Sequence, residues 1–226
     1  MEIVFHGVRG GILRPIKKYI FRNLIGITIE DGENKILLDA GTSKVIGDRK
    51  IKAILLSHTH IDHILHLKEI IKSLKFRVPI YTPQKLWLNK REAEQKTNIP
   101  EKICGFKIDY IQTNHCKKNY CYKLRKDGKV ICYTGDTHYF EELSDFCKNS
   151  DVLICEATHP NTYRKRSKIR GHMRPMDVIK LALEAKPKLL VLTHFNKLAP
   201  DIFLSYVKEK FPNAIASHER LRIKIS

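Results

Sequence analysis

The chain has 226 residues, of which 42% are hydrophobic, so it is long and apolar enough to bury a core, and wholesale disorder is excluded. Its formal net charge of +18 is unusual for an ordinary metabolic enzyme. The charge favours an anionic partner such as nucleic acid or a phosphate ester, although a lysine-rich composition also arises from genome bias or adaptation to heat.

No segment approaches the apolar run of about 20 residues that a membrane-spanning helix needs. The first residues lack the basic and apolar regions of a signal peptide. We therefore expect a cytoplasmic protein with no membrane contact. The six cysteines contain no Cys-x-x-Cys pair, which predicts reduced thiols, and Cys132 and Cys155 lie in apolar runs typical of buried strands.

The first half of the chain is predicted to form strands joined by tight turns, over residues 3–8, 24–30, 35–39 and 53–57. The Asp-Gly-Glu-Asn segment at 31–34 predicts a hairpin between the second and third of them. Apolar residues at helical spacing predict helices over 65–74 and 83–96, and we expect Trp87 in the second helix to pack rather than to stack on a base.

The second half repeats this mixture. It predicts strands over residues 106–111, 120–124, 130–133, 152–155 and 189–192, and helices over 141–148, 176–185 and 201–210. There are no repeats, low-complexity tracts or Pro/Gly/Ser linkers, so one domain over residues 1–226 is the economical interpretation. Strands in both halves with interspersed helices indicate an α/β sandwich, in which stacked sheets are covered by helices.

The strongest local motif follows the buried strand at 53–57 and has the sequence Ser-His-Thr-His-Ile-Asp-His. Its four metal-binding side chains are His58, His60, Asp62 and His63. His58 and His60 are expected on one side of an extended segment because side chains alternate along a strand. A lone histidine is usually a surface or core residue, but so dense a group would need several coincidental burials of polar side chains.

This H-x-H-x-D-H motif resembles the signature of the metallo-β-lactamase superfamily. Four further motifs of that family follow the same order along the chain, at Asp39, His115, Asp136 and His194. The resemblance covers the chain from its start to about His194. It implies the αββα sandwich of that family, with two mixed β-sheets flanked by helices, and it implies that Asp39 supports the site rather than binding metal.

The resemblance also implies a centre for two metal ions. One ion would be held by His58, His60 and His115, and the other by Asp62, His63 and His194, with Asp136 between them. Imidazole and carboxylate ligands suit Zn²⁺ first, with Mn²⁺ or Fe as alternatives. A metal-bound hydroxide would be the nucleophile, because two divalent ions lower the pKa of a bound water.

Glu156 and His172 narrow the subclass. The segments around Asp136, Glu156 and His172 resemble those of ribonuclease Z and its phosphodiesterase relatives. The resemblance implies that His172 is the general acid at the leaving oxygen and that Glu156 orients it, so both are expected to be catalytic together with Asp62. The alternative is that His172 is an exposed loop residue and Glu156 a surface carboxylate.

One departure from ribonuclease Z concerns the substrate. That enzyme usually carries a tRNA-gripping arm between the motifs matching His115 and Asp136, and here a predicted hairpin fills most of this short interval. The spacing is more similar to phosphodiesterases acting on cyclic phosphates, but the extra cysteine-rich zinc site of one such enzyme has no counterpart near the start of this chain. The substrate is therefore an RNA end or a small or cyclic phosphodiester.

Two other functions remain open. One is hydrolysis of a carbonyl substrate such as a thioester, lactone or lactam, and the other is that of a catalytically idle nucleic-acid-binding member. The expected partner is an anionic phosphodiester, with RNA among the candidates, and a homodimer would be unsurprising. The basic segment 164–170 is a substrate loop through Arg164, Arg166 and Arg170, a dimer contact or a solvated face. A second basic cluster spans residues 14–22.

Overall fold

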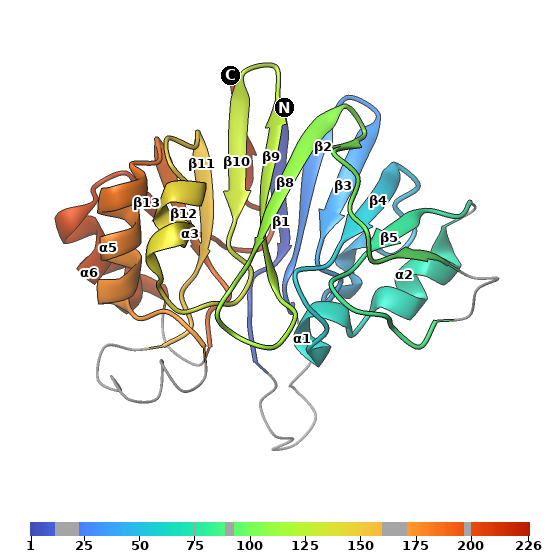
Figure 1. Ribbon diagram of the computed structural model, residues 1–226, viewed down its shortest axis with the longest axis horizontal. Coiled ribbons are helices and arrows are strands. Elements are labelled where there is room, and N and C mark those ends of the chain that lie inside the picture. Colours follow the sequence, from blue (N-terminus) through green and yellow to red (C-terminus); the bar gives the residue numbers. More distant parts are fainter. Residues whose placement is uncertain (12–22, 75, 89–92, 160–170, 197–199) are drawn as a thin grey trace. The chain divides into compact units, whose positions relative to one another are not determined.

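The computed structural model describes residues 1–11, 23–74, 76–88, 93–159, 171–196 and 200–226 (Figure 1). The chain divides into two compact units. Unit 1 comprises residues 1–105 and 218–226, and unit 2 comprises residues 106–217. The single domain expected over residues 1–226 stays a prediction.

The first sheet has seven strands in the order β14-β1-β2-β3-β4-β5-β6. Its strands are β1 (Glu2–Gly7), β2 (Gly26–Asp31), β3 (Asn34–Leu38), β4 (Ile51–Leu55), β5 (Pro79–Tyr81), β6 (Glu94–Lys96) and β14 (Arg222–Lys224). The strands from β14 to β3 pair antiparallel and those from β3 to β6 pair parallel, so the sheet is mixed. The predicted hairpin joins β2 to β3, and its turn contains Gly32 with a φ of +59°.

Three short helices accompany this sheet: η1 (Ser43–Val45), α1 (Ile61–Ile64) and α2 (Leu67–Ser73). Helix α2 buries Leu67, Ile70 and Ile71, which belong to one apolar cluster with buried residues of β3 and β4. This packing lets α2 lie beside β4 and β5 (Figure 1). The helix predicted over 65–74 is thereby confirmed at slightly shorter length.

The second sheet also has seven strands, in the order β13-β12-β11-β10-β9-β8-β7. Its strands are β7 (Lys102–Ile103), β8 (Phe106–Gln112), β9 (Tyr120–Lys126), β10 (Lys129–Tyr133), β11 (Val152–Glu156), β12 (Leu189–Thr193) and β13 (Ala214–Ala216). The edge strand β7 precedes the unit boundary at Gly105. Strands β8 to β10 pair antiparallel and β10 to β13 pair parallel. Asp127 and Gly128 both have positive φ, as a tight β9–β10 hairpin turn requires.

Helices α3 (Glu141–Phe146), α5 (Pro175–Ala185) and α6 (Pro200–Lys210) lie together on one side of this sheet (Figure 1). Helix α5 begins with Pro175 in its first turn, and the Asp177 carboxylate accepts the backbone N–H of Arg174 at 3.1 Å and the Arg174 guanidinium at 2.8 Å. It ends where Lys186 takes a left-handed conformation with a φ of 50°. Its buried face joins an apolar cluster that includes the buried residues Cys155 of β11 and Leu190 of β12.

Two expectations about the segment 83–96 are wrong. The described part of this segment contains no helix, and residues 94–96 form the parallel edge strand β6 beside β5. Residues 89–92 lie outside the described residues. Trp87 does not pack, because 98% of its surface is exposed. Strands β5, β6, β7, β13 and β14, of two or three residues each, were not expected, since so short a run shows no alternation of side chains.

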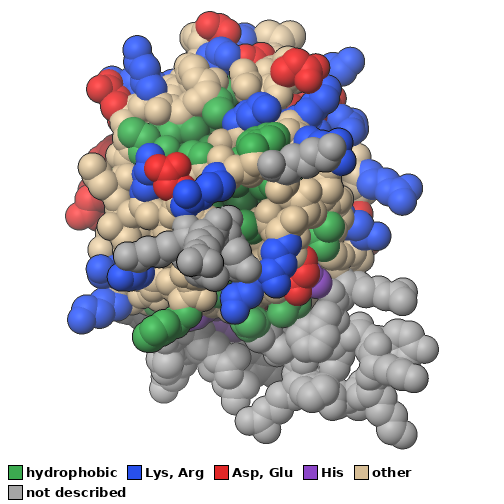
Figure 2. All heavy atoms as spheres, turned by 90° about the vertical axis from the view of Figure 1, so that its right-hand side faces the viewer, with side chains coloured by type: hydrophobic (Ala, Val, Ile, Leu, Met, Phe, Trp, Pro, Cys, Tyr) green, Lys and Arg blue, Asp and Glu red, His purple; other side chains and the backbone are tan. Residues whose placement is uncertain are grey.

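The positive charge is dispersed on the side shown in Figure 2, which is the right-hand side of Figure 1. Lysine and arginine side chains project at many points there, with aspartate, glutamate and apolar side chains between them. The predicted basic clusters at 164–170 and 14–22 lie outside the described residues. Among the described residues, no helix combines the length and apolar character needed to cross a membrane.

Candidate functional site

In each unit, parallel strands bring polar side chains to one edge of the sheet. In unit 1 the parallel strands β3 and β4 are followed by Asp39 and by the motif at 57–63. In unit 2 the strands β8, β10, β11 and β12 run in one direction, and the residues at or just beyond their carboxyl ends are His115, Asp136, Glu156 and His194. Such an edge is the usual ligand-binding side of a parallel sheet.

The unit 1 cluster contains the four motif side chains. The ring of His58 lies with its centroid 4.5 Å from that of His60 and 4.1 Å from that of His63, as the alternation in the motif predicts for the first pair. His58, Asp62 and His63 are buried, whereas His60 is exposed. Asp62 and His63 lie on α1, a separate helix of four residues rather than the first turn of the next one.

Asp39 organises this cluster. It is fully buried and has a left-handed backbone with a φ of 58°. Its carboxylate accepts hydrogen bonds from the backbone N–H of Ser57 at 2.7 Å and the Ser57 hydroxyl at 2.8 Å. It also lies 2.8 Å from Nδ1 of His63. A carboxylate with three such contacts is suited to orienting ligands, the role the sequence implies.

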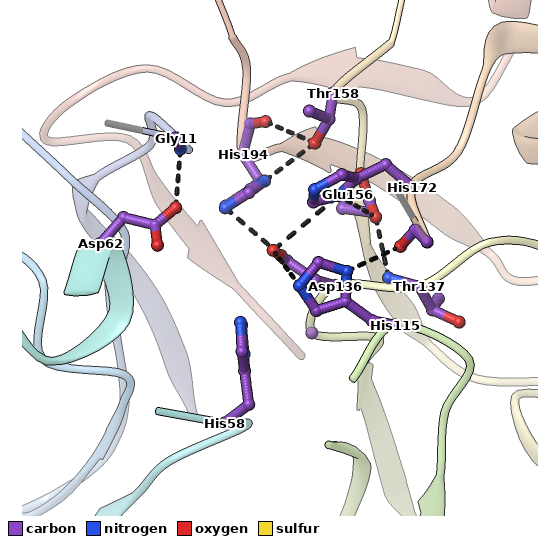
Figure 3. Close-up of polar contacts among 12 residues, drawn as sticks. Gly11, His58, Asp62, His115, Asp136, Thr137, Glu156, Thr158, His172 and His194 are labelled. Carbon is purple, nitrogen blue, oxygen red and sulfur yellow. Dashed lines mark hydrogen bonds and ion pairs between the residues drawn. The ribbon is translucent and has the colours of Figure 1, made fainter. Parts of the chain in front are cut away.

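The acceptors around these rings fix where the imidazole protons lie. The Ser57 hydroxyl has a single proton, which it donates to Asp39. Ser57 Oγ is therefore the acceptor of the hydrogen bond with Nδ1 of His58 at 3.1 Å. Nδ1 of His63 donates to Asp39 in the same way. In both rings Nε2 is then the unprotonated nitrogen that a metal ion requires. Asp62 Oδ2 accepts the backbone N–H of Gly11 at 2.6 Å (Figure 3).

The unit 2 cluster gathers imidazoles around the Asp136 carboxylate (Figure 3). Nε2 of His194 lies 3.3 Å from Oδ1 of Asp136, and Nε2 of His115 lies 3.7 Å from Oδ2. Nδ1 of His115 lies 3.0 Å from the carbonyl oxygen of Gly171, which can only accept, so this nitrogen carries the proton. Both rings therefore direct Nε2 toward Asp136.

Thr158 sets the same tautomer in His194. The Thr158 hydroxyl donates to the His194 carbonyl oxygen at 3.1 Å and accepts from His194 Nδ1 at 2.9 Å (Figure 3). His194 has a left-handed backbone with a φ of 58°, an uncommon conformation that is frequent at functional sites. The ring is buried.

His172 and Glu156 form the pair that the sequence predicts. Nδ1 of His172 lies 2.9 Å from Oε1 of Glu156, which also accepts the backbone N–H of Thr137 at 2.8 Å. Glu156 is buried, and 14% of the His172 side chain is exposed. Ligand atoms of His172 also lie within 4.8 Å of those of Asp136 and His115, and of Glu156 and His194. The geometry therefore suits either a proton donor or a metal ligand.

Several supporting groups had no place in the sequence prediction. These are the Ser57 and Thr158 hydroxyls, the Gly11 and Thr137 amides and the Gly171 carbonyl. A backbone donor or acceptor leaves no trace in the sequence, whereas Thr158 lies two residues after Glu156 and could have been found by alternation. Arg164, Arg166 and Arg170, the predicted substrate contacts, lie outside the described residues.

Comparisons with known proteins identify the family of the chain. Residues 34–195 match the family model described as the beta-lactamase superfamily domain. The ribonuclease Z of Clostridium botulinum (strain Alaska E43 / Type E3) is 27% identical over 216 residues, which cover 92% of this chain and 66% of that protein. The chain thus spans slightly less than two thirds of that relative's length.

Two solved structures are similar over nearly all of the chain. The metallo-beta-lactamase fold protein YhfI from Bacillus subtilis has a TM-score of 0.85 at 23% identity, with 98% of each chain covered. The short form of human tRNase Z has a TM-score of 0.76 at 17% identity, with 100% of each chain covered. These likenesses show the fold and confirm the predicted metallo-β-lactamase architecture of two mixed sheets with flanking helices.

Proposed function

The chain belongs to the β-lactamase superfamily, as a metallo-hydrolase with a His/Asp metal site, and from this premise we propose that it hydrolyses phosphodiester bonds. The substrate would be RNA or a small or cyclic nucleotide-like phosphate.

The observation that carries the metal part of the proposal is the protein group that lies at each imidazole Nδ1. In His58, His63, His115 and His194, Nδ1 is held by a protein acceptor, and Nε2 is the ligand atom. Metal-binding histidines are held in this way, because the second hydrogen bond fixes the ring and raises the basicity of the ligand nitrogen. The donor set fits a divalent metal ion well.

We propose the ligand set that the family motifs imply. His58, His60 and His115 would hold one ion and Asp62, His63 and His194 the other, and Asp136 would contribute its carboxylate to the centre. Imidazole and carboxylate ligands favour Zn²⁺, with Mn²⁺ as the alternative. When bound, such ions supply an activated water and neutralise charge that develops on the phosphate.

The His172–Glu156 pair supports a phosphodiester substrate. The contact with Glu156 keeps the Nδ1 proton in place and aims Nε2 away from the carboxylate. His172 then donates a proton from Nε2 to the oxygen that leaves phosphorus, and the negative charge of Glu156 stabilises the imidazolium before transfer. A ribose oxygen is a poor leaving group without this proton. The similarity to ribonuclease Z and tRNase Z favours the same bond type.

The test combines metal content with turnover. The purified protein is loaded with Zn²⁺ or Mn²⁺ and offered bis(p-nitrophenyl) phosphate, a 2′,3′-cyclic nucleotide, a short single-stranded RNA, a thioester and a lactam. We expect about two metal ions per chain and hydrolysis confined to the phosphate esters. Opening of the thioester or lactam with the phosphates untouched would contradict the bond type, and metal binding without any turnover would indicate an idle binding protein.

A further inference from the structure

A pocket of about 370 Å³ opens at the turn between β8 and β9 in unit 2. Its volume lies within the range of about 300–1,000 Å³ that small-molecule sites occupy. The residues that line it include Gln112, Asn114, His115, Lys117, His138 and Gly171.

The pocket adjoins the proposed proton donor. Gly171 immediately precedes His172, and the rings of His115 and His172 lie with their centroids 4.6 Å apart. His172 does not itself line the pocket, and a group that fills the pocket contacts Gly171 and His115, the two neighbours of His172. In the proposed function His172 protonates the leaving oxygen, so the pocket is in position to receive the part of the substrate that carries this oxygen.

The pocket has the chemistry of a nucleoside site. Asn114 and Gln112 offer side-chain amides, which pair with the edges of bases, and the exposed Lys117 offers a cation for a phosphate. Nδ1 of His138 is buried and has no hydrogen-bond partner among the described residues. A ribose or base can satisfy such groups, whereas an apolar acyl chain would leave them buried and unpaired.

Two tyrosines continue the pocket along the strands. Gln112 is the cross-strand partner of Tyr120, and Tyr110 lies two residues earlier on the same face of β8. The rings of Tyr110 and Tyr120 lie with their centroids 4.7 Å apart at 44°, and 39% of the Tyr110 surface is exposed. Exposed aromatic rings are the usual platform for unstacked bases of single-stranded nucleic acid.

The turn that forms the pocket is held in shape by its own hydrogen bonds. The backbone N–H of Thr113 donates to the Asn119 carbonyl at 2.9 Å, and the Gln112 amide donates to the Lys117 carbonyl at 3.0 Å. The buried Asn119 side chain also donates to the Asp136 carbonyl. A preformed turn reduces the entropy lost when a ligand binds.

We propose that this pocket and the Tyr110–Tyr120 pair bind the nucleoside that carries the leaving oxygen, and that the substrate is therefore single-stranded RNA. The proposal rests on the proposed function. The oxygen of water bonds to phosphorus and one of its protons passes to solvent, while the bond from phosphorus to the ribose oxygen breaks. That oxygen takes the Nε2 proton of His172, which regains a proton from solvent. A cyclic phosphate releases no nucleoside, because both oxygens stay on one ribose, and the exposed Tyr110–Tyr120 pair favours an RNA chain over such a substrate.

The kinetic test compares two substrates that differ only in the leaving group. The metal-loaded protein is given the dinucleotide UpU, whose leaving group is a nucleoside, and the p-nitrophenyl ester of uridine monophosphate. Tyr110→Ala should raise the KM for UpU about tenfold, because one base loses its stacking partner, and should change ester hydrolysis at most about twofold. Tyr110→Phe, which keeps the ring, should restore UpU binding.

Lys117→Ala tests the role of the pocket's positive charge, and Lys107→Ala is its matched control. Lys107 is exposed on the opposite face of β8, and its loss should leave UpU hydrolysis unchanged, whereas loss of Lys117 should raise the KM for longer RNA. Equal losses on both substrates in Tyr110→Ala, or no loss on either, would overturn the nucleoside site.

A second readout needs no turnover. UpU with 4-thiouridine as the leaving nucleoside is photocrosslinked to the protein, and the modified peptides are identified by mass spectrometry. Crosslinks within residues 110–120 are expected. A protein that cleaves RNA but crosslinks elsewhere, or nowhere, overturns the nucleoside site alone. A protein that crosslinks at 110–120 but hydrolyses no phosphodiester contradicts the proposed function and keeps the nucleoside site.

Discussion

The carbonyl oxygen of Gly171 lies 3.0 Å from Nδ1 of His115, and a side chain on this glycine would collide with the same histidine. A Cβ at position 171 would lie 2.5 Å from the His115 Cα atom, and the φ of Gly171 is +66°. The glycine is therefore required twice, for its backbone conformation and for its approach to a proposed ligand.

Gly171→Ala should consequently weaken both the fold and the metal site. The left-handed backbone alone costs about 1–2 kcal/mol, and displacement of His115 adds to that. The matched control is Gly128→Ala, because Gly128 has a φ of +73° and a Cβ added there would meet no neighbouring atom within 4 Å. Thermal unfolding and zinc content measure the difference. Equal effects of the two substitutions would show that the contact with His115 is unimportant.

Asp39→Asn should loosen the unit 1 ligands without removing one. The amide nitrogen of asparagine cannot accept a hydrogen bond, so one of the contacts to Ser57 or His63 is lost. Asparagine still tolerates the left-handed backbone at this position. Changes to such supporting groups typically cost about 10–100-fold in metal affinity. Competition with a chelator measures zinc affinity, and Asp145→Asn, at an exposed side chain of helix α3, serves as the control. Unchanged affinity would contradict the supporting role.

The metal-binding residue types were predictable because they stand in short motifs at the ends of apolar runs. The strand before His58 is a continuous buried run. In unit 2 the parallel strands β10, β11 and β12 are also buried runs, so the residues beyond these three strands had to lie at one edge of their own sheet. The Glu156–His172 contact was anticipated from family resemblance, and the structure has it at 2.9 Å.

Apart from the Ser57 and Thr158 hydroxyls, the features that sequence reasoning missed have no side-chain pattern. The Gly171 carbonyl and the Gly11 amide are backbone groups that any residue could supply. The segment around Trp87 has helical spacing of apolar residues, yet pairing of β6 with β5 takes its end into the sheet and leaves Trp87 in solvent. Tertiary pairing overrides local propensity in such short segments.

His172→Ala tests the acid role against the ligand role. Loss of a general acid should lower kcat about 10²–10⁴-fold for an RNA substrate and leave the metal content intact. The loss should be much smaller with a p-nitrophenyl ester, whose leaving group needs no proton. Glu156→Gln should give a smaller loss, and the double variant should resemble His172→Ala, since the two residues act as a unit. Loss of one metal ion from the His172→Ala variant would instead indicate that His172 is a metal ligand.

Thiol reactivity tests the packing of unit 2 independently of catalysis. Burial raises the pKa of the Cys132 and Cys155 thiols well above the usual range and also raises that of Cys121, so none of the three should ionise near neutral pH. Cys104 and Cys116 are half-buried.

Because the thiolate is the reactive form, a disulfide reagent at pH 8 should modify Cys104 and Cys116 within minutes and the remaining four cysteines only after unfolding. Mass spectrometry identifies the modified sites, with Cys116→Ser as the control that removes one fast reaction. Rapid modification of Cys132 or Cys155 in the folded protein would show that the cluster beneath β10 and β11 is open to solvent.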